Sequence, residues 1–359
     1  MEETKNKAFE KSEFSGNVYI FFAFDVGNDI KVEQIKQDAT IQKTSSQQSK
    51  FLQDFHIPLN IELPHPHDSG RCISSKLHQF GVISLTYKVP VFGTLQEMKS
   101  LMVEIDEKYQ EQSIQDAASI FKKINKHIIT PHFFHLRNYY TVIQIDTQEN
   151  ITGKEIQQNH GPEIASLVRF ETESLSEAQK KLIFNQEIGY FTNDLIIIDT
   201  EAAFVYDEQY EEILIFFEIG NIQQLELQYF NNLIDTQLNV MYEERSLPLP
   251  LLSYLPFIGS KYFDPLREVN RLQVDISVIT ERFEAIVKIV GEPFYANVYE
   301  QLIEKLDIVN WKERIEKKFS IIKEIKHFYQ HKVDTHREDL LSVLIIVLII
   351  LELIVATTH

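Results

Sequence analysis

Two pairs of histidines are the residues whose type and spacing come nearest to a chemical site. His65 and His67 flank a proline, and His132 and His135 follow another proline. Imidazole nitrogens bind zinc and iron, so the two pairs together could supply a metal centre. Neither spacing matches an established ligand motif, and nothing in the sequence brings the two pairs together. We therefore predict loop histidines and no metal site.

The other residues with catalytic potential form no recognisable motif. Cys72 lies between Arg71 and Ile73, a setting typical of a small buried apolar side chain rather than a nucleophile. The glycines are isolated, so no phosphate-binding loop is present, and the G-x-S-x-G nucleophile elbow is absent. The sequence predicts no catalytic, cofactor-binding or metal-binding residue and no cofactor. A membrane-tethered enzyme of hydrolase type, with its site in the N-terminal body, is the alternative.

The overall charge of the chain is strongly acidic, with 53 Asp and Glu residues against 35 Lys and Arg residues and a formal net charge of −18. Such a body repels phosphate backbones, so we expect no nucleic-acid partner. The single cysteine excludes a disulfide within the chain and favours a reducing compartment. The segment from Met1 to Phe14 mixes acids with lysines and lacks the apolar core of a signal peptide.

The C-terminal segment LLSVLIIVLIILELIVATT, from Leu340 to Thr358, is almost wholly apolar. As a helix, residues 340–357 are about 27 Å long, close to the roughly 30 Å hydrocarbon core of a bilayer. A soluble surface helix would carry a polar stripe, which this segment lacks. A buried core helix or an oligomer interface is the alternative to the predicted transmembrane helix. The predicted anchor residues are Leu340, Leu344, Ile345, Ile346, Leu348, Ile349, Ile350 and Glu352.

Basic residues flank the predicted span on one side only. Lys323, Lys326, Lys332 and Arg337 precede it, and no Lys or Arg follows it. The positive-inside rule then keeps the N-terminal body in the cytoplasm or an equivalent compartment. We expect a bacterial inner membrane, or a mitochondrial inner membrane with the body in the matrix. The lipid bilayer is thus one predicted partner.

The elements that precede the anchor divide the chain into two halves. The first half alternates strand and helix patterns, with strands predicted at Val18–Phe24, Val82–Val89 and Tyr139–Ile145. A capping box at Thr94 starts a predicted helix that runs toward Ile105, and a second helix is predicted from Ser113 to Ile128. A hairpin is predicted over residues 195–206. These patterns indicate an α+β body.

The second half is predicted to be helical, except for a proline-rich connector. Two apolar stripes at helical spacing predict a long antiparallel, coiled-coil-like hairpin, which pairs within one chain or between chains of an oligomer. Its packing residues are Leu272, Ile276, Ile279 and Phe283 on the first helix, and Trp311, Ile315, Phe319, Ile322 and Tyr329 on the second. The predicted segments are an N-terminal tail (1–15), the α+β body (16–207), a central helix (208–245), the connector (246–260), the hairpin (261–339) and the transmembrane helix (340–357).

The second half also resembles a known family. An aromatic pair, Phe294-Tyr295, is followed by a polar helix at Val298–Ile308, a long basic helix at Trp311–Asp339 and an apolar span that contains one acid, Glu352. This order resembles the "required for meiotic nuclear division" family, which includes yeast proteins and a mitochondrial animal protein. The likeness is strongest over the last 65 or so residues and extends more loosely from Asp194.

The resemblance implies a role in supporting translation at a membrane, as part of a large complex. Together with the anchor and the absence of catalytic motifs, it predicts a membrane-anchored, non-enzymatic scaffold or adaptor that self-associates. A tail-anchored effector is a further alternative. The sequence names neither the protein partner nor the size of the oligomer.

Overall fold

The computed structural model describes residues 12–44, 58–63, 71–134, 136–149, 151–245, 272–274, 276–277, 281 and 293–358. The chain divides into two compact units. The first comprises Met1–Tyr229 with Glu281–Val309, and the second comprises Phe230–Thr280 with Asn310–His359. Helix α6, Glu211–Arg245, contributes residues to both units.

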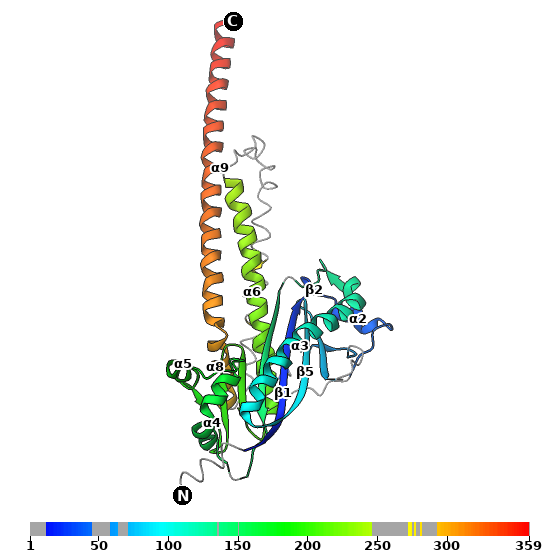
Figure 1. Ribbon diagram of the computed structural model, residues 1–359. Coiled ribbons are helices and arrows are strands. Elements are labelled where there is room, and N and C mark those ends of the chain that lie inside the picture. Colours follow the sequence, from blue (N-terminus) through cyan, green and yellow to red (C-terminus); the bar gives the residue numbers. More distant parts are fainter. Residues whose placement is uncertain are drawn as a thin grey trace. The chain divides into compact units, whose positions relative to one another are not determined.

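A sheet that includes β1 and β5 forms the centre of the first unit (Figure 1). In the described part of the chain it has eight strands in the order β3-β4-β5-β1-β7-β10-β9-β8. All neighbouring strands pair antiparallel except β7 and β10, which pair parallel. The strands are β1 (Phe14–Asp25), β3 (Leu59–Asn60), β4 (Cys72–His78), β5 (Val82–Gly93), β7 (Arg137–Ile145), β8 (Glu187–Ile188), β9 (Leu195–Ile198) and β10 (Ala202–Tyr206). A separate pair joins β2 (Asp29–Ile30) to β6 (Ile128–Ile129).

The alternation of side chains in β1 and its neighbours gives the sheet two buried faces. On one face, Phe22 contacts the rings of Tyr87 and Tyr139, with centroids 5.8 and 5.7 Å away. On the other face, Tyr140 stacks on Phe217 of α6 at 5.4 Å. Helices therefore cover both sides of the sheet, as expected for a mixed α+β domain.

The helices of the first face are α3 (Leu95–Ile124) and α4 (Gly153–Leu167), both of which begin with a capping box. In α3 the Thr94 side chain accepts a hydrogen bond from the Glu97 backbone N–H, and the Glu97 carboxylate accepts one from the Thr94 N–H in return. The prediction of a capping box at Thr94 is confirmed. Short helices α2 (Val32–Gln37) and α5 (Glu177–Ile183) and the single turn η2 (Asn125–His127) complete this part of the chain.

Among the described residues after α6 are the helices α8 (Pro293–Lys305) and α9 (Ile308–Thr358). In the first unit, α8 packs on α6 at Gly220, where a Cβ atom would lie 2.7 Å from the Leu302 side chain. In the second unit, the Lys318 ammonium on α9 donates to the Asp235 carboxylate and the Asn231 amide oxygen of α6, at 2.6 Å each. These contacts hold α9 against the end of α6.

The predicted strands are all confirmed, with longer bounds, and the sheet adds strands around them. The prediction of two helices over residues 95–128 was wrong, because α3 runs unbroken to Ile124. The polar stretch Asp106–Gln112 contains no proline or glycine, so nothing in it stops a helix. Helices α4 and α5 were not predicted; Pro162 lies within α4.

The antiparallel hairpin stays a prediction. Its second helix forms part of α9, but most of its first helix lies outside the described residues. Ile276, Ile315, Phe319 and Ile322 are buried, and Leu272 and Trp311 are half-buried. Ile279, Phe283 and the side chain of Tyr329 lie outside the described part of the chain.

Candidate functional site

A cavity of about 850 Å³ opens at one end of the sheet in the first unit. Four segments form its wall: the turn after β7, the loop between β8 and β9, the turn after β10 and the start of α8. They are far apart in the sequence, and the order of strands β7-β10-β9-β8 brings the first three together. The lining residues are Thr147, Gln148, Glu149, Tyr190, Phe191, Thr192, Asn193, Asp194, Asp207, Glu208, Gln209, Phe294 and Tyr295.

The charge of this lining is wholly negative, with four carboxylates and no Lys, Arg or His side chain. Asp194 accepts a hydrogen bond from the Phe191 backbone N–H at 2.7 Å, which fixes the loop between β8 and β9. Asp207 accepts one through Oδ1 from the Gln209 N–H at 2.7 Å, and its residue surface is only 6% exposed. Burial raises the pKa of Asp207, and the neighbouring charges of Asp194 and Glu208 raise it further.

Aromatic rings form the other part of the wall. Tyr190 and Phe191 are each 62% exposed, with their ring centroids 4.7 Å apart in an edge-on arrangement. The Tyr190 ring also lies 5.3 Å from that of Phe294, which in turn lies 5.3 Å from that of Tyr295. Tyr295 donates its hydroxyl hydrogen to the Glu212 carboxylate at 2.5 Å, so its ring is held in place. Large exposed rings beside carboxylates are a feature of binding surfaces rather than of stable cores.

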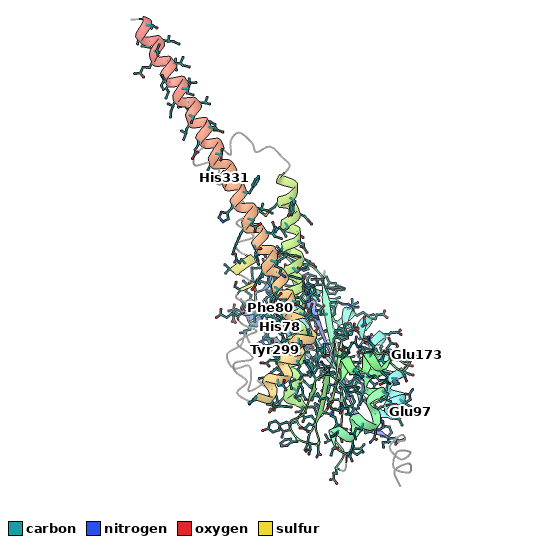
Figure 2. The ribbon with its side chains drawn as sticks, turned by 90° about the vertical axis from the view of Figure 1, so that its left-hand side faces the viewer. His78, Phe80, Glu97, Glu173, Tyr299 and His331 are labelled. Carbon is teal, nitrogen blue, oxygen red and sulfur yellow. The ribbon has the colours of Figure 1, made fainter. Side chains whose placement is uncertain are left out.

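A second polar cluster lies between the sheet and α6. The Lys76 ammonium donates to Glu218 Oε2 at 2.5 Å, and Ser84 donates to Glu218 Oε1 at 3.1 Å. His78 Nε2 lies 3.0 Å from Ser84 Oγ, and its ring lies 5.3 Å from that of Phe80 (Figure 2). Because Ser84 uses its hydrogen on Glu218, His78 is the donor in the contact between them.

This Lys76–Glu218 cluster has the residue types of a hydrolytic site but not its geometry. Burial lowers the pKa of His78 to about 4, so the ring is neutral at pH 7. Burial opposes ionisation of Glu218, but its interactions with Lys76, and then with His78 and Ser84, together outweigh burial and lower the pKa of Glu218. Ser84 is 2% exposed, and none of these residues lines the described cavity. The cluster therefore fixes α6 on the sheet and offers no access to a substrate.

The histidines singled out in the sequence do not form a described metal centre. His132 Nε2 contacts Asp25 Oδ2 at 2.7 Å, and the His132 ring lies 6.5 Å from the ring of Tyr229. His65, His67 and His135 lie outside the described residues. Within the described chain, no group of three or more His, Cys, Asp or Glu side chains has the arrangement of a metal site.

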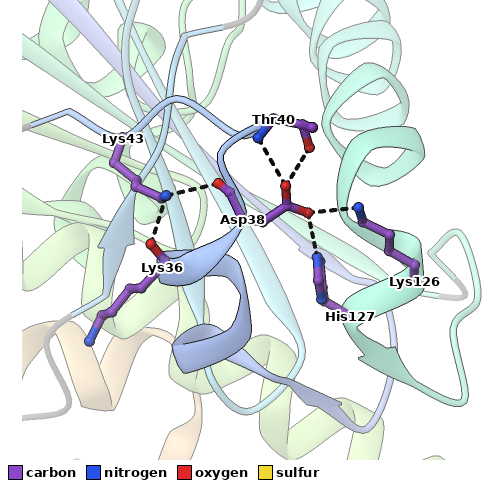
Figure 3. A network of polar contacts seen from close by, with 6 residues as sticks. All are labelled: Lys36, Asp38, Thr40, Lys43, Lys126 and His127. Carbon is purple, nitrogen blue, oxygen red and sulfur yellow. Dashed lines mark hydrogen bonds and ion pairs between the residues drawn. The ribbon is translucent and has the colours of Figure 1, made fainter.

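Cys72 and Asp38 both have surroundings that fit a role in the fold. Cys72 begins β4, and burial raises the pKa of its thiol to about 12, so it is a poor nucleophile. Asp38 accepts hydrogen bonds from Lys126, His127 and Thr40 (Figure 3), which together lower its pKa, the Lys126 bond most of all. These contacts tie the loop after α2 to η2.

The apolar end of α9 is the clearest feature of the second unit. Residues Glu338–Thr357 form a 20-residue segment with a mean hydropathy of 3.0, and none of it is buried. All eight predicted anchor residues lie in this segment and are exposed. By length and composition, this one described helix is able to cross a membrane.

Together these features define a class of protein: a mixed α+β domain followed by a C-terminal helix apolar enough to span a bilayer. The chain belongs to the family described as "Uncharacterized protein MJ0711, N-terminal domain", whose model matches residues 15–212. It is 25% identical over 195 residues to the protein of that name from Methanocaldococcus jannaschii. That match covers 54% of this chain and 58% of the relative, so the chain spans little more than half the relative's length. No solved structure is significantly similar to it.

The family match covers the sheet and ends at the start of α6. The resemblance to the "required for meiotic nuclear division" family rests mainly on residues beyond the matched region, and it stays a prediction. The cavity has wall residues on both sides of this limit, since Asp207 lies within the matched region and Phe294 beyond it.

Proposed function

We propose that the protein is a membrane-anchored, non-enzymatic scaffold or adaptor whose α+β body binds a partner near the bilayer. The observation that carries the proposal is the exposed apolar segment Glu338–Thr357, which belongs to the end of α9, an unbroken helix of 51 residues. An exposed surface of this hydrophobicity is unstable in water, and a bilayer removes it from water.

Two properties of the body support an adaptor over an enzyme. The buried charges of the Lys76–Glu218 cluster satisfy one another, and this cluster lies away from the cavity. The described cavity wall has no Ser, Cys, Lys or His side chain, so it offers no serine or cysteine nucleophile, no Schiff-base lysine and no histidine base. Its exposed aromatic rings, by contrast, suit recognition of a partner.

Further parts of the proposal concern topology and assembly. The basic residues that precede the span favour a body in the cytoplasm, at a bacterial inner membrane, or in the matrix if the membrane is the mitochondrial inner membrane. The apolar stripe of Ile315, Phe319 and Ile322 supports a helical hairpin or coiled coil, within the chain or between copies. The resemblance of the second half supports a role in translation at the membrane.

A fractionation experiment tests the anchor. The full chain and a form that lacks Leu340–His359 are expressed in parallel, and membranes are washed with alkaline carbonate. We expect the full chain in the pellet and the truncated chain in the supernatant. If the truncated chain stays in the pellet, another segment anchors the protein; if the full chain is washed out, it has no membrane span.

A cross-linking experiment tests the adaptor role. The full chain is cross-linked in native membranes through its surface lysines, extracted and analysed by mass spectrometry. An adaptor gives reproducible cross-links to itself or to a defined partner. Recovery of the chain as an uncross-linked monomer under conditions that cross-link a known membrane complex contradicts it.

A further inference from the structure

The cavity at the end of the sheet combines three properties that are independent of one another. Its volume of about 850 Å³ lies within the range of small-ligand sites. Its described wall has carboxylates and no cationic side chain. Its rim carries two aromatic rings that are 62% exposed, although burial of such rings stabilises a folded chain.

Asp207 is the residue that points to a ligand. It is 6% exposed and lines the cavity, yet among the described residues only the Gln209 N–H donates to it, through Oδ1. A buried carboxylate is costly unless a cation or several donors compensate it. The nearby charges of Asp194 and Glu208 increase that cost.

The aromatic rings favour the same kind of ligand. The face of a tyrosine or phenylalanine ring attracts a cation within about 6 Å, most strongly where water is excluded. Tyr190, Phe191 and Phe294 form a continuous group, with centroid separations of 4.7 and 5.3 Å. The rings and the carboxylates line the same cavity, so its wall offers an ammonium or guanidinium group both kinds of partner. A metal ion is a poorer fit, because the described residues contain no cluster with the geometry of a metal site.

We infer that this cavity binds an organic cation: an ammonium or guanidinium group on an aliphatic stem, in which Asp207 pairs with the charge and Tyr190 and Phe294 enclose the stem. A lysine or arginine side chain of a partner and a free alkylamine share this chemistry. The inference deepens the adaptor proposal, because it names what the body recognises. The binding itself does not depend on the membrane anchor.

Binding is coupled to protonation. A bound cation favours the ionised form of Asp207, so the carboxyl group loses a proton when the ligand enters. Affinity therefore rises with pH until Asp207 is ionised in the free protein, and it becomes independent of pH above that point. A general attraction of cations to an acidic surface lacks this link to one residue.

The test uses the full chain in zwitterionic phosphatidylcholine nanodiscs and calorimetric titration at low salt. Four probes are compared: a Gly-Ser peptide with one central lysine, the same peptide with arginine, the same peptide with norleucine, and pentylamine. We expect saturable binding of cationic probes and none of the norleucine peptide. Tighter binding of a peptide than of pentylamine assigns the cation to a partner protein, and equal or tighter binding of pentylamine assigns it to a small amine.

Variants locate the site. Asp207→Asn keeps the size of the side chain, and we expect it to weaken binding at least tenfold and to abolish the rise of affinity with pH. Tyr190→Ala, at an exposed ring, should weaken it about fivefold. Matched controls are Glu173→Gln and Phe92→Ala, exposed positions that do not line the cavity, with affinities within twofold of the parent.

The inference is overturned if no cationic probe saturates, if norleucine binds as tightly as lysine, or if Asp207→Asn binds like the parent while circular dichroism shows it folded. If Asp207→Asn does not fold, the inference is instead overturned when Tyr190→Ala binds the cationic probes as tightly as the parent. The fractionation experiment tests the membrane anchor separately from ligand binding. The anchoring proposal and the cavity inference can therefore fail independently.

Discussion

His78 makes the stability of the body depend on pH, and the substitution His78→Gln isolates that dependence. The ring lies between the sheet and α6 at 6% exposure, surrounded by Lys76 on β4, Ser84 on β5 and Glu218 on α6. It donates to Ser84 as a neutral group. Glutamine is neutral at every pH and keeps an N–H donor for Ser84, so the variant removes the titration and preserves the contact.

The size of the effect follows from the shift in pKa. In the unfolded chain the pKa of the ring is 6.5, and in the folded chain it is lowered to about 4. Between these values the unfolded chain binds a proton that the folded chain does not, so stability rises with pH. The shift corresponds to about 3 kcal/mol in total, of which about 2.5 kcal/mol falls between pH 4.5 and 7.

Other carboxyl groups also titrate in this range, so the difference between two proteins is the useful quantity. The pKa of Glu226 is raised by burial and by the charge of Asp25, which destabilises the fold as pH rises above 4.5. This contribution is the same in the parent and in His78→Gln, and it cancels in the difference.

The assay is urea unfolding of the full chain in detergent, followed by circular dichroism at pH 4.5, 5.5 and 7. The parent should lose about 2.5 kcal/mol more than His78→Gln between pH 7 and 4.5. His331→Gln, at an exposed position on α9, is the control and should follow the parent. Parallel profiles of the parent and His78→Gln would refute the assignment of a buried neutral histidine.

Three other outcomes follow from the helices. Phe319 is 7% exposed, so Phe319→Ala should lower the free energy of unfolding in urea by about 3 to 5 kcal/mol, and Phe319→Asp should lower it more. Lys317→Ala, at an exposed position, should change it by less than about 0.5 kcal/mol. Equal stabilities of these variants would show that the stripe is not buried. Gly220→Val should lower the free energy of unfolding by about 1 to 3 kcal/mol, and Gly220→Ala by less, because an added Cβ would lie 2.7 Å from the Leu302 side chain. If Gly220→Val is as stable as the parent, α8 does not pack there. Protease added outside sealed cells should leave the body intact, and its digestion would reverse the predicted orientation.

Lys318 illustrates how neighbouring positions on one helix differ. It lies next to Phe319 in the sequence, but its ammonium contacts both Asp235 and Asn231 of α6 and is 23% exposed. Its substitution by alanine is therefore not a neutral control for Phe319, and Lys317 at 77% exposure is the better choice. Sequence periodicity places both lysines on the outer face and does not distinguish them.

The strands of the body could be predicted from the sequence because their patterns are local. Val18–Phe24 is rich in β-branched and aromatic residues, and two buried faces allow a continuous apolar run. The helix boundaries were less accurate where no proline, glycine or cap marks an end, as between Ile105 and Ser113 in α3. The most accurate prediction was that of the apolar helix at the end of α9, because composition alone identifies such a segment.

The cavity could not be predicted, because its wall is assembled from segments that are distant in the sequence. Glu149 follows β7, Asp194 precedes β9 and Asp207 follows β10. No local sequence pattern links these residues. The parallel pairing of β7 with β10 brings the segments that follow these two strands together. In an acidic chain each one is indistinguishable from a solvated surface residue. Two aromatic pairs were the local signals: Tyr190-Phe191 in an otherwise polar loop, and Phe294-Tyr295 at the start of α8.

The polar contacts of α6 explain why this helix lacks a simple apolar stripe. Its sheet-facing side carries Glu218, which binds Lys76, and Asn221, whose side-chain amide donates to the Phe21 carbonyl oxygen at 3.0 Å. An apolar helix could slide on the sheet by a turn at little cost, but these partners are satisfied in one register only. The same register places Glu212 where it accepts the hydrogen bond of Tyr295 at the cavity wall. The buried polar cluster thus positions the candidate binding site without being part of it.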